Sequence, residues 1–143
     1  MITIIAGGKK HPAWLTEATS EYEKRLKKPF EIKWEFFEEE KLLQKLEKWE
    51  FTGRDFVILT DERGTNISSP ELAGKFEKAF VESKNVVIII GGAYGFPPEI
   101  REKADFLWSF SRLVFPHQIA RLIVVEQIYR SQEILGGHPY HHV

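Results

Sequence analysis

Three short apolar runs constrain the fold of this chain more than any other feature. They cover residues 1–6, 56–59 and 86–90, and apart from Thr3 each is apolar at consecutive positions rather than at alternate ones. A strand that is apolar on both faces is covered on both faces, which is typical of parallel sheets flanked by helices. Apolar residues at helical spacing follow each run. The sequence therefore predicts an α/β fold with a mostly parallel sheet flanked by helices.

The remaining elements follow from periodicity and from helix-end signals. Residues 30–37 alternate roughly with period two, which predicts a strand, and residues 106–110 predict a weak one. Ser69 before Pro70 and Glu71 is typical of an N-cap, so a helix is expected there. A long helix is expected from residue 116 to residue 135, where Gly136 and Gly137 end it. With no internal repeat or linker, residues 1–143 are expected to form one domain.

Composition excludes several classes of protein. The chain has no cysteine, which rules out disulfides, thiol catalysis and thiolate metal sites. The formal net charge is −1, so bulk electrostatic attraction to bare nucleic acid is not expected. No apolar run approaches the length of a membrane span, and the first residues do not resemble a signal peptide. A soluble cytoplasmic protein is expected.

The long helix carries few polar residues, and these are the first candidates for chemistry. A helix that is apolar nearly all round is buried in a core or an interface, so Arg121, Glu126 and Arg130 are expected to be partly buried. Glu126 and Arg130 are four residues apart and can meet. They are either a structural ion pair at a dimer interface or part of a polar wall for a ligand. His117 precedes Arg121 by one turn, on another side.

Two candidate loops follow strands, at the edge of the sheet where α/β proteins bind ligands. Residues 91–95, Gly-Gly-Ala-Tyr-Gly, allow a ligand to approach the backbone, or they form only a tight turn. Their spacing matches neither the dinucleotide nor the P-loop signature. Residues 61–64, Asp-Glu-Arg-Gly, are either a turn or part of a site lining.

The tail from His138 to His142 resembles a metal cluster only superficially. Its histidines have no helical spacing and no carboxylates accompany them, so no metal is expected. The tail is either a disordered terminus or an element that stacks on a nucleobase. His11 is expected to be a surface residue before a helix.

Together these pieces resemble one family from end to end. The motifs are Thr60-Asp61-Glu62-Arg63-Gly64, Ile90-Gly91-Gly92-Ala93-Tyr94-Gly95, Ser109-Phe110-Ser111, Phe115-Pro116-His117-Gln118-Ile119-Ala120-Arg121, Glu126-Gln127-Ile128-Tyr129-Arg130 and His138-Pro139-Tyr140-His141. In order and interval they are similar to the small SPOUT-class methyltransferases, of the H type, that modify N3 of a pseudouridine in large-subunit (23S) ribosomal RNA.

The resemblance implies a C-terminal trefoil knot, against the usual rule that chains are unknotted. It implies S-adenosylmethionine as methyl donor, no metal, a homodimer with a composite active site, and ribosomal RNA within the ribosome as substrate. The cofactor would be held by three loops. By resemblance, these contain Leu59, Thr60, Gly91, Gly92, Ser111, Arg112, Leu113, Val114, Phe115 and Pro116.

The catalytic residues expected from the resemblance are His117, Glu126, Arg130, Tyr140 and His141. N3 must lose a proton as it attacks the methyl group, so a base, or a cation that stabilises the anionic ring, is needed. Arg130, oriented by Glu126, would hold the cofactor or the ring charge. Tyr140 and His141 would position the base, and His141 or His117 would accept the proton.

Some positions depart from the family pattern. Thr60 stands where leucine is common and Val114 where threonine is common, while His142 and Val143 stand where a basic residue usually ends the tail. The near-neutral charge fits an enzyme that recognises an assembled ribosome. Two alternatives remain: a non-catalytic ribosome-binding module with the same fold, and a different α/β nucleotide-binding enzyme.

Overall fold

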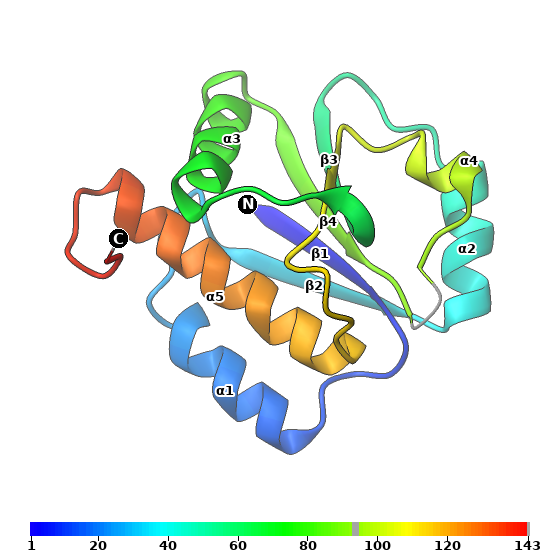
Figure 1. Cartoon of the computed structure of the whole chain (residues 1–143), viewed down its shortest axis with the longest axis horizontal. Coiled ribbons are helices and arrows are strands. Elements are labelled where there is room, and N and C mark those ends of the chain that lie inside the picture. Colours follow the sequence, from blue (N-terminus) through cyan, green and yellow to red (C-terminus); the bar gives the residue numbers. More distant parts are fainter. Residues whose placement is uncertain (93–94, 143) are drawn as a thin grey trace.

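A five-stranded parallel sheet forms the centre of the protein, with strand order β2-β1-β4-β3-β5 (Figure 1). The computed structural model describes residues 1–92 and 95–142, so Ala93, Tyr94 and Val143 of the predicted motifs lie outside the described residues. The elements are β1 Ile2–Gly7, α1 Ala13–Glu23, β2 Ile32–Phe37, α2 Glu39–Lys48, β3 Asp55–Thr65, α3 Ser69–Val81, β4 Asn85–Ile90, α4 Pro98–Arg101, β5 Phe106–Trp108 and α5 His117–Leu135. The predicted α/β class and parallel sheet are confirmed.

Helices cover both faces of the sheet, which explains why its inner strands β1, β4 and β3 are apolar at consecutive positions. In β4, Val86 and Ile88 face one core, together with α3 and α5. Val87 and Ile89 face the other core, together with α2 and Ile100 of α4. The alternation of side chains along a strand therefore feeds two separate cores. Figure 1 shows α1, α3 and α5 on one side and α2 and α4 on the other.

The apolar character of α5 is largely explained within one chain. The helix packs between α1 and α3 and against β4, and it buries Val124, Val125 and Ile128 completely. It begins after Pro116 and ends at Gly136, and the following Gly137 has a φ of +70°, which glycine adopts without strain. The expected burial of Arg121, Glu126 and Arg130 is also found.

Three local expectations need correction. The N-cap of α3 is Ser68 rather than Ser69, because Ser68 and Glu71 form a reciprocal capping box. Ser69 instead donates its hydroxyl hydrogen to Gln127 of α5, at 2.7 Å. Strand β3 runs on to Thr65 through residues 61–64, with Thr60 and Thr65 both in register with Trp108. Strand β5 ends at Trp108, two residues before the expected end.

The capping box gives a stability prediction. Ser68→Ala removes the acceptor for the Glu71 amide, and the free energy of unfolding is expected to fall by about 1 kcal/mol. Urea unfolding followed by circular dichroism measures the change. Lys78→Ala, an exposed substitution in the same helix, is the control and should change the midpoint little. An unchanged midpoint for Ser68→Ala would assign the cap to another residue.

Among the described residues, none of the helices is both long enough and apolar enough to cross a membrane. The path of the C-terminal segment through a trefoil knot stays a prediction of the family resemblance. Strands β3, β4 and β5 are neighbours and parallel, so their carboxyl ends meet at one edge of the sheet. This edge is where a ligand site is expected.

Candidate active site

A cavity of about 210 Å³ lies where the ends of β3, β4 and β5 meet the start of α5. Its lining combines backbone-rich glycines, aromatic rings and a few ionisable groups. The lining residues are Thr60, Asp61, Glu62, Arg63, Ile90, Gly91, Gly92, Gly95, Trp108, Phe110, Ser111, Leu113, Val114, Phe115, His117 and Ala120. Leu113 and Val114 are 69% and 72% exposed, so apolar surface also surrounds this site.

Hydrogen bonds shape the segment between β5 and α5. The Ser109 hydroxyl donates to the Ser111 carbonyl at 2.9 Å, and the Ser111 hydroxyl accepts from the Leu113 amide at 3.1 Å. The Asn66 side-chain amide donates to the Ser109 carbonyl at 2.8 Å. Short polar side chains that bond to nearby backbone replace the ladder bonds lost after a strand. The serines of the predicted motif thus fold this wall of the cavity.

Gly91 is needed because the ring of Phe96 lies against its backbone. A Cβ at Gly91 would come within 2.6 Å of that ring, which is too close for any side chain. Gly95 has a φ of +70°, a conformation that residues with side chains rarely adopt. Both glycines line the cavity. The two readings of residues 91–95, a tight turn and a loop that a ligand can approach, are compatible. The glycines permit close packing, and they also leave backbone exposed to the cavity.

Most residues predicted to hold a cofactor line this one cavity. Thr60, Gly91, Gly92, Ser111, Leu113, Val114 and Phe115 do so, together with His117. Three do not line it: Leu59 is buried in the opposite core, while Arg112 and Pro116 are exposed. Trp108 and Ala120 were not predicted as site residues. Their positions, next to predicted site residues on β5 and α5, were the only signal in the sequence.

Asp61 and Arg63 form an ion pair on the cavity lining. The Asp61 carboxylate is completely buried and accepts from the Arg63 backbone amide at 2.9 Å, from Nε at 3.0 Å and from Nη2 at 3.1 Å. Burial opposes ionisation of Asp61, but the hydrogen bonds from Arg63 outweigh it, so the pKa of Asp61 lies below its ordinary value. The carboxylate is therefore ionised at neutral pH.

A second polar cluster lies on the later turns of α5. Arg130 donates from Nε to Glu126 at 2.8 Å, and Tyr140 donates its hydroxyl hydrogen to the same oxygen at 3.2 Å. The Arg130 guanidinium lies 4.8 Å from the centre of the Tyr140 ring. The expected meeting of Glu126 and Arg130 is found. The tail is folded back on its own helix, with His138 also bonded to Glu133 at 2.7 Å.

The electrostatics of this cluster restrict what each residue can do. The hydrogen bond to Glu126 raises the pKa of Arg130, so the cation is permanent. Burial and the nearby Glu126 charge raise the pKa of Tyr140 to about 12, so it stays a neutral phenol. Arg130 Nη1 lies 3.1 Å from His141 Nδ1, and because arginine only donates, this nitrogen must accept. His141 then carries its proton on Nε2.

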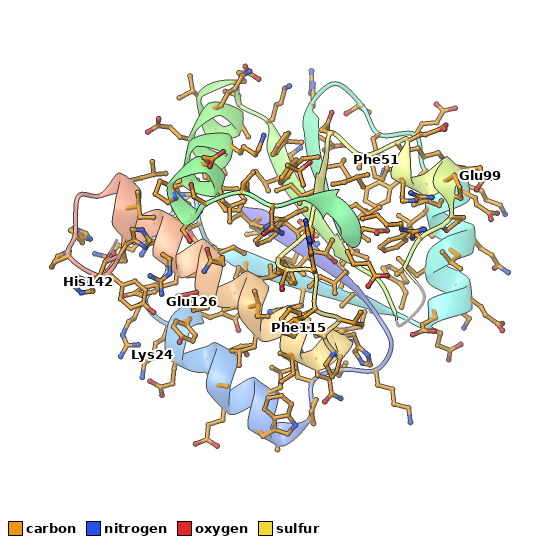
Figure 2. The ribbon with its side chains drawn as sticks, in the orientation of Figure 1. Lys24, Phe51, Glu99, Phe115, Glu126 and His142 are labelled. Carbon is orange, nitrogen blue, oxygen red and sulfur yellow. The ribbon has the colours of Figure 1, made fainter. Side chains whose placement is uncertain are left out.

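The cavity and the cluster are separated along one helix. Ala120 is the last residue of α5 on the cavity lining, and Arg130 follows ten residues later, roughly 15 Å along the axis at 1.5 Å per residue. In Figure 2, Phe115 lies near the start of α5, Glu126 lies farther along, and His142 lies beyond it. Of the five predicted catalytic residues, only His117 is therefore at the cavity. The other four form the distant cluster.

Arg121 and His11 correct one expectation from the sequence. Arg121 is completely buried and donates to the carbonyls of Gly7 and Lys9, at 3.1 and 3.0 Å. It also donates to His11 Nδ1 at 3.3 Å, because only the histidine can accept. His11 packs edge-on against the rings of Trp34 and Phe36. His11 is thus half-buried between α5 and β2, rather than an ordinary exposed residue before a helix.

The environment of His11 gives a pH prediction. Burial and the Arg121 charge lower the pKa of His11 from 6.5 to about 4. Below pH 6.5, His11 becomes protonated in the unfolded chain but stays neutral in the folded protein. The free energy of unfolding should therefore fall as the pH is lowered from 6.5 to about 4. His11→Gln should lose less stability over this range than the wild type, as measured by urea midpoints at the two ends. Equal losses would contradict the burial of a neutral His11.

Parallel α/β proteins with a ligand cavity at the carboxyl ends of their strands include many enzymes that bind nucleotides. A solved SpoU methyltransferase, AviRb from Streptomyces viridochromogenes, shares this fold with a TM-score of 0.51 at 11% identity. The similarity covers 96% of this chain and 61% of that one. Within the described residues, no group of three or more histidines or carboxylates could hold a metal.

Sequence comparison defines the family more closely. A family model described as "Predicted SPOUT methyltransferase" matches residues 1–141, so the chain belongs to the SPOUT methyltransferase family. One relative, "Ribosomal RNA large subunit methyltransferase H" of Acetivibrio thermocellus, is 38% identical and covers 98% of both chains. A protein of the same name from Geobacter metallireducens is 40% identical over 99% of this chain and 98% of its own.

Proposed function

We propose that this protein transfers a methyl group from S-adenosylmethionine to N3 of a pseudouridine in large-subunit (23S) ribosomal RNA. The observation that carries the proposal is full-length similarity to relatives named as large-subunit ribosomal RNA methyltransferases. The cavity at the ends of β3, β4 and β5 supports it, because it combines the three segments expected to hold the cofactor. The place of action is then the cytoplasm, on ribosomal RNA that is already part of a ribosome.

The cavity suits a folded nucleoside with a short charged arm. Trp108, Phe110 and Phe115 offer aromatic surface for a purine, and exposed backbone at Gly91 and Gly92 offers hydrogen bonds to its edge. When bound, S-adenosylmethionine supplies an electrophilic methyl group on a sulfonium. The protein itself must orient the acceptor base in line with that methyl group and exclude competing water.

The separation of the cavity from the Arg130 cluster favours a homodimer with shared active sites. A cluster roughly 15 Å along a rigid helix cannot serve the cavity of its own chain. A second copy, related by a two-fold axis, can bring its cluster to the first cavity and receive the first cluster in return. The exposed Leu113 and Val114 supply apolar surface beside the cavity for such a contact. Each site would then combine the cavity of one chain with Arg130, Tyr140 and His141 of the other.

The protonation states assign roles within that shared site. Arg130 supplies a permanent positive charge that stabilises the ring anion formed as N3 loses its proton. His141 offers its Nε2–H donor to a carbonyl oxygen of the base, because its Nδ1 accepts from Arg130. Tyr140 already donates its hydroxyl hydrogen to Glu126 and stays a neutral phenol, so it positions the base through its ring rather than as a donor. His117 lines the cavity and is therefore the proposed proton acceptor.

Two measurements test the proposed function. Calorimetric titration with S-adenosylmethionine should show saturable binding, whereas a non-catalytic ribosome-binding module should show none. Labelled methyl transfer to ribosomes that lack the modification, followed by mass mapping, should place the methyl group on one pseudouridine. Absence of cofactor binding in the folded protein, or methylation of another nucleotide, would contradict the proposal.

A further inference from the structure

Arg63 connects two segments of the cavity wall that are far apart in the sequence. Its Nε and Nη2 donate to the two carboxylate oxygens of Asp61 on the extended end of β3. The same Nη2 also donates to the backbone carbonyl of Phe96, at 3.2 Å. Phe96 lies beyond the end of β4, thirty-three residues along the chain. One guanidinium therefore contacts three oxygen atoms, two on β3 and one in the segment that follows β4.

Phe96 and the Asp61–Arg63 ion pair pack directly against the glycines of the cavity lining. The Phe96 ring lies against Gly91, where a Cβ would meet it at 2.6 Å, and Phe96 itself is only 3% exposed. At Gly95, a Cβ would lie 3.0 Å from Arg63 Nη2 and 3.4 Å from Asp61 Oδ2. The ion pair is thus packed directly on this wall. Arg63 is therefore in contact with Phe96 and close to Gly95, and the Phe96 ring in turn lies against Gly91.

Arginine is suited to this connection in a way that lysine is not. Its planar fork can present several N–H groups in fixed directions, so it can bond both oxygens of a carboxylate and a third acceptor at once. Asp61 is buried and already ionised, so the fork has a fixed partner before any ligand binds. Arg63 is 48% exposed in its side chain, so burial of the arginine is not the source of this geometry.

We propose that Arg63, held by Asp61, is a positioning residue for the methyl donor: it fixes the Gly91, Gly95 and Phe96 wall in the shape that binds the cofactor. This inference rests on the proposed function for the identity of the ligand. The hydrogen bond that joins Arg63 of β3 to the Phe96 carbonyl is observed independently of that function. Arg63 acts through the wall, so it should affect cofactor affinity far more than the chemical step.

Cofactor binding tests the proposal with Arg63→Lys, which keeps the charge and removes the fork. The dissociation constant for S-adenosylmethionine, measured by calorimetry, should rise about tenfold, the effect of one charge-assisted hydrogen bond. The KM for the cofactor should rise in parallel, while kcat at saturating cofactor should change less than about twofold. The control is Arg54→Lys, an exposed arginine just before β3, which should bind as the wild type does.

Hydrogen exchange of the cofactor-free protein tests whether Arg63 holds Gly91, Gly95 and Phe96 in place. The Gly95 amide donates to the Gly92 carbonyl at 3.3 Å and should exchange faster in Arg63→Lys than in the wild type or in Arg54→Lys. Unchanged exchange together with unchanged affinity would overturn the proposal. If the wild type bound no S-adenosylmethionine, the proposed function would be wrong, and the exchange comparison would still decide whether Arg63 holds this wall.

Discussion

Equal amounts of His117→Ala and Arg130→Ala chains, coexpressed, are expected to recover about a quarter of wild-type methyl transfer, although each variant alone loses it about a hundredfold or more. The reason is geometric. His117 lies at the cavity and Arg130 lies in the distant cluster. In the proposed homodimer with shared sites, a mixed pair would have one site with both substitutions and one site with neither. Half of the pairs are mixed, and half of their sites are intact.

A double variant provides the control for this complementation. Wild type coexpressed with a His117→Ala/Arg130→Ala chain should retain about a quarter of full activity, because every site of a mixed pair lacks one residue. If both residues acted within one chain, this mixture would retain about half, and the two single variants would not complement each other. Methyl transfer per mole of chain, measured on ribosomes lacking the modification, distinguishes the two arrangements.

Arg121→Ala is expected to have the largest effect on stability, a loss of about 3–5 kcal/mol in the free energy of unfolding. The substitution leaves the buried carbonyl of Gly7 and the partly buried carbonyl of Lys9 without this donor and opens a cavity beneath α5. Relief of a buried charge offsets part of this cost, since burial already lowers the pKa of Arg121. The structure shows no carboxylate paired with Arg121 among the described residues, so no second charge is left behind.

Comparison with Arg121→Met separates the two causes of that loss. Methionine fills most of the volume but donates no hydrogen bond, so its loss should be smaller than that of alanine and still measurable. Urea unfolding at pH 7, followed by fluorescence of the tryptophans, gives both values. A stability of Arg121→Ala within about 1 kcal/mol of wild type would show that the contacts with Gly7 and Lys9 contribute little.

The periodicity of apolar residues predicts the inner strands of the sheet, because a strand that is buried on both faces has a recognisable local pattern in the sequence. The runs at β1, β3 and β4 are apolar at consecutive positions since each strand feeds two cores. The N-cap of α3 was misplaced by one residue because Ser68 and Ser69 are both suitable side chains. Only the tertiary contact with Gln127 decides which of them faces α5.

The candidate site was predictable only in part. Parallel strands end at one edge, which is why residues after β3 and β4 could be grouped in advance. The distance between His117 and the Arg130 cluster needs the length of α5 and the direction of the tail. Family resemblance gave the residues of both groups without giving their separation. His11 was misjudged because its burial comes from Trp34, Phe36 and Arg121, which are distant in sequence.

In the proposed homodimer, helix α5 of each chain contributes residues to both reaction centres. Its first turn borders one cavity through His117 and Ala120, and its later turns carry Glu126 and Arg130 toward the other. The helix packs between α1 and α3, which fixes its direction relative to the sheet. One continuous helix would then set the spacing between the two reaction centres, so a change in the length or direction of α5 would displace His117 at one site and Arg130 at the other.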